Sequence, residues 1–65
     1  MIIKGIVSSK NEHKNTAEIM FPEFDNVITA ELPFYNKSAT AVDIGDFVIV
    51  ALFNDGQDFC DGVIL

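Results

Sequence analysis

The chain has little of the chemistry from which small domains build disulfides, metal sites or catalytic centres. Cys60 is its single cysteine and His13 is its single histidine. One cysteine cannot form an internal disulfide, and one cysteine with one histidine cannot supply the four ligands of a structural zinc site. No nucleophile can be named beside His13, so an exposed loop histidine is expected there. The sequence therefore predicts no enzyme activity, no catalytic residue, no bound metal and no cofactor.

Three aspartates surround the last turn of the chain: Asp55, Asp58 and Asp61. Their carboxylates could hold a calcium ion, but the spacing does not match an EF-hand loop, which needs acids at alternate positions and a closing glutamate. The prediction is a charged turn in solvent.

Positive charge is scarce. Four lysines stand against ten acidic residues, which gives a net charge of −6. Residues 38–65 carry five aspartates and no basic residue, for a net charge of −5. An acidic half repels phosphate backbones, so nucleic acid is not expected as a partner.

Long apolar runs are also missing. No stretch approaches the roughly 20 residues that a membrane helix needs, and the apolar residues at 1–7 are too few for a signal-peptide core. We expect a chain without a membrane segment, made in the cytoplasm. Its 65 residues are expected to form a single domain over 1–65.

A domain of this size buries only about 60% of the surface that its unfolded chain exposes. With no disulfide or metal available, docking on another subunit is the remaining means of stabilisation. Hydrophobic residues make up 49% of the chain. Part of this apolar surface is therefore expected to meet a partner.

Short runs of apolar and β-branched residues between turn residues predict an all-β fold. The expected strands cover residues 2–8, 16–21, 27–32, 47–53 and 59–64. The run 47–53 is the most continuously apolar and predicts a buried strand.

Alternation predicts which side chains of the second and third strands face the core. In the second strand the inward residues are expected to be Ala17, Ile19 and Phe21. In the third strand they are expected to be Ile28, Ala30 and Leu32, with Thr29 and Glu31 outward.

The order of these strands is typical of a small five-stranded OB-type barrel. An SH3-like barrel also has five short strands and remains the alternative. An OB barrel commonly places a helix between its third and fourth strands, but Ser, Thr and Val are indifferent helix formers. Between Pro33 and Asp46 the helix is therefore expected to be absent or one turn long. Gly62 interrupts the last strand and predicts a bulge or a bend.

Three aromatic residues lie in turns or at the start of a loop: Phe24, Phe34 and Tyr35. OB barrels can stack nucleic-acid bases on aromatic side chains, but that mode also requires a cationic groove. With four lysines against ten acids, we expect these three residues to contact a protein partner instead.

Several segments together resemble one protein family. Residues 16–22 (TAEIMFP) and 25–33 (DNVITAELP) resemble the hairpin of strands 2 and 3 in the phage baseplate assembly protein V family, the spike proteins of contractile tails. Residues 43–50 (DIGDFVIV) and 59–65 (FCDGVIL) resemble the turn with strand 4, and strand 5, of the same module. The match covers nearly the whole chain.

The resemblance implies an OB-fold domain that docks a spike onto the central tail hub, usually as a trimer. Members typically continue into a β-helical needle, which would begin at Leu65, so only the docking part is expected to carry over. We therefore expect a structural, non-enzymatic component of a contractile phage tail or phage-derived particle. Its expected partners are its own copies, as a homotrimer, and the hub and baseplate proteins. The alternative is a module that binds single-stranded nucleic acid, or another small OB binding module.

Overall fold

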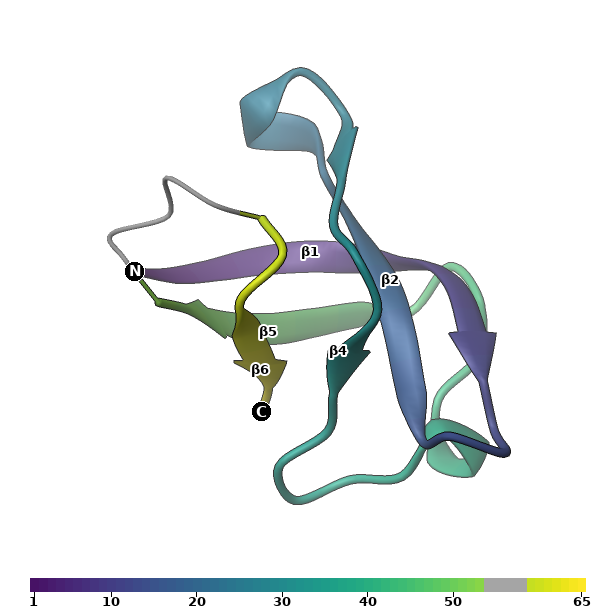
Figure 1. Ribbon diagram of the computed structural model, residues 1–65. Helices are drawn as coiled ribbons and strands as arrows, with labels where there is room; N and C mark the ends of the chain where they lie inside the picture. Colours follow the sequence, from purple (N-terminus) through teal and green to yellow (C-terminus); the bar gives the residue numbers. More distant parts are fainter. Residues whose placement is uncertain (54–58) are drawn as a thin grey trace.

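The computed structural model describes residues 1–53 and 59–65, and the strands of this part form one antiparallel sheet of six strands (Figure 1). The strands are β1 (Ile2–Asn11), β2 (Thr16–Phe21), β3 (Val27–Ile28), β4 (Leu32–Pro33), β5 (Phe47–Leu52) and β6 (Gly62–Ile64). Two short 3-10 turns, η1 (Pro22–Phe24) and η2 (Ala39–Ala41), lie in the connections. The all-β prediction is confirmed, and η2 is the single turn expected between the third and fourth predicted strands. Within the described ranges, no helix has the length and apolar character that crossing a membrane requires.

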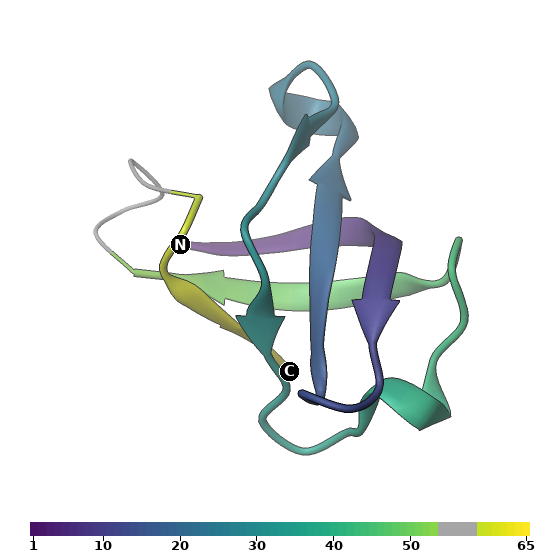
Figure 2. The same ribbon diagram turned by 45° about the vertical axis from the view of Figure 1, so that its right-hand side comes forward.

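β1 joins the two halves of the sheet: β2, β3 and β4 form one half, and β5 and β6 form the other. The order is β3-β2-β1-β5-β6, and β4 pairs with β2 beside this path. The register of the β1–β2 pair shifts between Val7 and Ser9, which leaves Ser8 as an extra residue in β1. Such a bulge bends a strand and increases its twist. Figures 1 and 2 accordingly show β1 and β5 crossing β2 and β4 at a steep angle.

The core lies between these crossing halves. Its largest fully buried side chains are Phe21, Ile19, Leu32, Leu52, Ile64, Val7 and Val50. The prediction that Ala17, Ile19 and Phe21 face the core is confirmed. Phe24 packs edge-on against Phe21, with 6.2 Å between the ring centroids, and Phe59 packs against both rings.

The third predicted strand is wrong in its middle, where the structure divides it into β3 and β4. Thr29, expected outside, is buried, while Ile28 and Ala30, expected inside, are exposed. Leu32 is buried as expected. The hydroxyl of Thr29 accepts a hydrogen bond of 3.0 Å from the amide of Ile19. Because this bond requires Thr29 to point inward, the alternation expected for one continuous strand does not hold.

The sheet is not closed. Its two ends meet at one parallel bridge between Phe34 and Ile64, where the amide of Tyr35 donates to the carbonyl of Ile64 at 2.8 Å. β6 begins at Gly62, later than predicted. A Cβ atom at Gly62 would lie 2.6 Å from the carbonyl oxygen of Ala51, so the close approach of β6 to β5 requires glycine. The five-stranded barrel expected from the strand order is therefore not confirmed.

Candidate functional site

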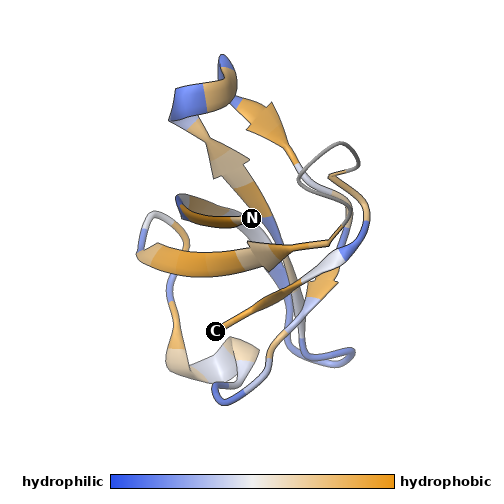
Figure 3. Cartoon of the chain, turned by 90° about the vertical axis from the view of Figure 1, so that its left-hand side faces the viewer, coloured by the Kyte–Doolittle hydropathy of each residue, from blue (hydrophilic) through white to orange (hydrophobic). Residues whose placement is uncertain are grey.

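The outer side of β5 is apolar and exposed. Phe47 is 63% exposed and Ile49 is 41% exposed, whereas Val48, Val50 and Leu52 alternate with them and are buried. The prediction of a buried strand is therefore wrong for the outward residues, since no layer of the described chain covers this side. In Figure 3 the strands are largely orange, for hydrophobic residues, and the blue hydrophilic residues lie mainly in the connections.

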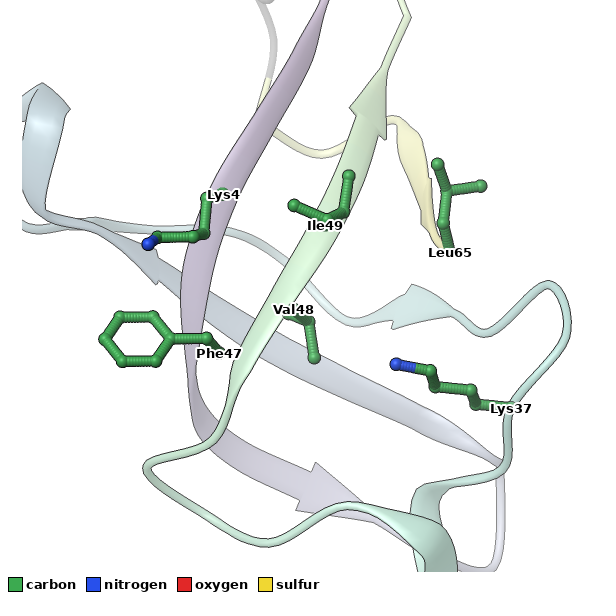
Figure 4. Close-up of a pocket in the computed structure, with 6 residues that line it drawn as sticks. All are labelled: Lys4, Lys37, Phe47, Val48, Ile49 and Leu65. Atoms are coloured by element: carbon green, nitrogen blue, oxygen red, sulfur yellow. The ribbon is translucent and has the colours of Figure 1, made fainter.

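A groove of about 530 Å³ lies beside the first half of β5. Its lining residues are Lys4 from β1, Phe47, Val48 and Ile49 from β5, Lys37 from the loop between β4 and η2, and Leu65 after β6. We call this surface the β5 groove. Figure 4 shows Lys4 and Lys37 on opposite sides of β5, with the amine of Lys37 pointing toward Val48. The middle of the groove is therefore apolar, and ammonium groups flank it.

The two lysines of the groove differ from the other two. Lys10 and Lys14 each form an ion pair with a glutamate of the chain, at 3.0 and 3.6 Å. Lys4 instead places its Nζ 4.6 Å from the centroid of the Phe47 ring, a cation–π contact that holds the charge over an apolar surface. No ion pair of Lys4 or Lys37 occurs within residues 1–53 and 59–65.

The backbone of β5 also has a free edge at the groove. The carbonyl of Asp46 and the amide of Leu52 bond to residues in or next to β1, at 2.9 and 2.7 Å. Because backbone groups in an antiparallel pair alternate in direction, those of Phe47 and Ile49 point away from β1. The carbonyl of Ile49 accepts a bond of 2.8 Å from the amide of Leu65. β6 pairs only with the second half of β5, so no described strand pairs with β5 at Phe47 on this side.

The three aromatic residues predicted to contact a partner lie outside the groove. Tyr35 is 69% exposed. Phe24 and Phe34 are half-buried and pack against the core. Of the three residues, Tyr35 alone is classed as exposed, and the contact role of all three stays a prediction.

Of the residues considered for catalysis or metal binding, the structure describes His13, Cys60 and Asp61. His13, in the turn between β1 and β2, is exposed, as are Cys60 and Asp61. Asp55 and Asp58, considered for calcium, lie outside the described residues. In the described part of the chain, no three His, Cys, Asp or Glu side chains lie close enough together to hold a metal ion.

Sequence reasoning missed the β5 groove because a continuous apolar run is typical of a strand buried on both faces. The useful signal was the size of the chain, since 65 residues leave little material for a layer over each face of the sheet. Since β5 has apolar residues on both of its faces, the residues of one face remain exposed when no second layer covers them.

Chemically, the groove combines apolar contact area, two ammonium groups and an unpaired strand edge, and each of these can contribute to binding.

Comparison of the chain with protein-family models, with curated proteins and with solved structures gave no match.

Proposed function

We propose that the chain is a structural, non-enzymatic docking domain of OB type, and that it serves in a contractile phage tail or phage-derived particle. The observation that carries this proposal is the amount of exposed apolar surface. The large hydrophobic residues left exposed are Met1, Ile2, Ile28, Tyr35, Ile44, Phe47, Ile49, Phe53 and Leu65. Burying such surface against other subunits is favourable by about 25 cal/mol per Å².

The arrangement of the strands supports the OB type. β1 bends at its bulge and serves both halves of the sheet, as the first strand of such a barrel does. On this proposal β3 and β4 correspond to the third strand of the barrel, and β6 corresponds to the fifth. The parallel bridge between Phe34 and Ile64 lies where these two strands would meet to close the barrel.

The setting in a contractile tail comes from the resemblance of residues 16–22, 25–33, 43–50 and 59–65 to the spike-protein family. On this proposal the domain sits as a spike or plug on the central baseplate hub, with the outer side of β5 against a hub protein. The copies meet in a homotrimer through the aromatic residues predicted for contact, of which Tyr35 is the exposed one. Because exposed apolar residues also lie outside the β5 groove, the domain can contact a hub protein and its own copies at the same time.

Quantitative mass spectrometry of contractile particles, purified by density gradient from the cells that encode the chain, tests this proposal. The expected result is that the chain travels with the hub proteins in a fixed ratio. Intact particles without the chain, with all of it in the unassembled protein fraction, would overturn the proposal.

A further inference from the structure

We propose that the β5 groove binds an extended segment of a partner protein, one that presents apolar side chains and at least one carboxylate. The inference rests on the proposed docking function and names the chemistry of the partner at that surface. Three independent features of the groove carry it: its charge, its apolar middle and its free backbone edge.

The charge indicates a carboxylate. The lining residues include Lys4 and Lys37 and no acidic residue, although the chain as a whole carries a net charge of −6. The charged side chains that line the groove are thus both cationic, on a protein that is acidic as a whole. Since complementary charge fixes the orientation of a partner and excludes wrong ones, an acidic segment is favoured here and a basic one is disfavoured.

The exposure of the apolar residues indicates a polypeptide instead of a small amphiphile. Pockets for small ligands usually enclose about 70–90% of the ligand surface. Here Phe47, Ile49 and Leu65 are all more than a third exposed, so a fatty acid lying on them would keep one side in water. A protein segment would cover the same surface, and the rest of the partner protein would shield the other side of that segment from water.

The backbone edge indicates an extended segment. The amide and carbonyl of Phe47 point away from β1, toward the side on which Lys37 and Leu65 lie (Figure 4). A strand added at this position would continue the line of β6 along β5. Main-chain hydrogen bonds give affinity in such strand addition, and alternate side chains give specificity.

A second copy of the chain is a poorer occupant. Pairing of the groove with itself around a two-fold axis would place Lys4 and Lys37 of both copies in one interface. Like charges facing each other across an interface oppose association.

The test uses two blocked peptides as probes, acetyl-Thr-Ile-Glu-Val-Glu-Ile-Thr-amide and the same peptide with lysine in place of glutamate. Each is titrated into the ¹⁵N-labelled chain. We expect the acidic peptide to shift the amide resonances of Phe47, Ile49 and Leu65 and to slow hydrogen exchange at Phe47. The double variant Lys4→Gln/Lys37→Gln should bind it at least tenfold more weakly, and Lys14→Gln should bind it as the wild type does.

Four results would overturn the inference. They are no shift at these amides with millimolar acidic peptide, equal binding of both peptides there, shifts caused by decanoate but not by the acidic peptide, and the same shifts on raising the protein concentration alone. The third would assign the groove to a small amphiphile and the fourth to a second copy. In each of these cases the proposed function would still stand if purified contractile particles contain the chain. Failure of the groove inference can therefore be distinguished from failure of the proposed function.

Discussion

Ile19 and Thr29 are joined by two hydrogen bonds that replace a regular strand pairing. The amide of Ile19 donates to the hydroxyl of Thr29 at 3.0 Å, and the amide of Thr29 donates back to the carbonyl of Ile19 at 2.9 Å. Thr29 is 3% exposed, and its hydroxyl donates in turn to the carbonyl of Ala30 at 2.7 Å. A buried side-chain oxygen therefore satisfies the backbone of β2 in the gap between β3 and β4.

Replacing Thr29 with valine should lower the free energy of unfolding by about 1–3 kcal/mol, because the buried amide of Ile19 loses its acceptor. Urea unfolding followed by circular dichroism measures the change. Thr29→Ser is the matched control and should lose less, since it keeps the hydroxyl. A valine variant as stable as the wild type would show that the hydroxyl does not serve β2.

Gly5 is required by the crossing of β1 over the core. A Cβ atom at this position would collide with Cγ2 of Ile19 and would lie 2.8 Å from Cδ1 and from Cε1 of the Phe21 ring. We expect Gly5→Ala to lower the free energy of unfolding by about 1–3 kcal/mol, the usual cost of overpacking a core. Ser8→Ala, in the same strand, is the control, and it should lower the free energy of unfolding less than Gly5→Ala does. A Gly5→Ala variant with unchanged stability would mean that the core has room for a methyl group here.

Lys10 fastens the loop that carries η2 to β1. Its Nζ donates to the carbonyl oxygens of Ala39 and Val42 at 3.1 and 2.6 Å, and the side chain is only 18% exposed. Lys10→Met should therefore lower the free energy of unfolding by about 1–3 kcal/mol. Lys14→Met removes the exposed ion pair with Glu31 and should cost about 0–1 kcal/mol. Equal losses in the two variants, measured by urea unfolding, would contradict this role of Lys10.

Single-stranded nucleic acid should not bind. The net charge is −6, and the two lysines of the β5 groove are too few to follow a phosphate backbone. A gel shift with a labelled oligothymidine at low salt is expected to show no complex. Binding that weakens as salt is added would support the nucleic-acid alternative instead.

Local patterns predicted much of the fold. The predicted strand 16–21 coincides with β2, and its alternation is regular because one face packs on the core throughout. The break at Thr29 was not predictable, since the pattern gives no sign that a side chain will replace a strand partner. The closure of the sheet was not predictable either, because it depends on the shear between strands and not on the side-chain pattern.

The candidate site was harder to predict than the fold. The exposed side of β5 depends on which strand covers which face, and this follows from tertiary arrangement. Lys4 and Lys37 lie 33 positions apart in the chain, and only the fold brings them to one groove. Tyr35 was predicted as a contact residue from its place at the start of a loop, and that role awaits experiment.

The most direct test of the docking function is the native mass of the purified chain, measured by light scattering after size exclusion over a series of concentrations. The wild type is expected to form a trimer of three times 7.2 kDa. Tyr35→Ser should shift it toward monomer, and Tyr35→Phe should keep the trimer. A wild-type chain that stays a monomer at every concentration would contradict the proposed self-assembling spike component.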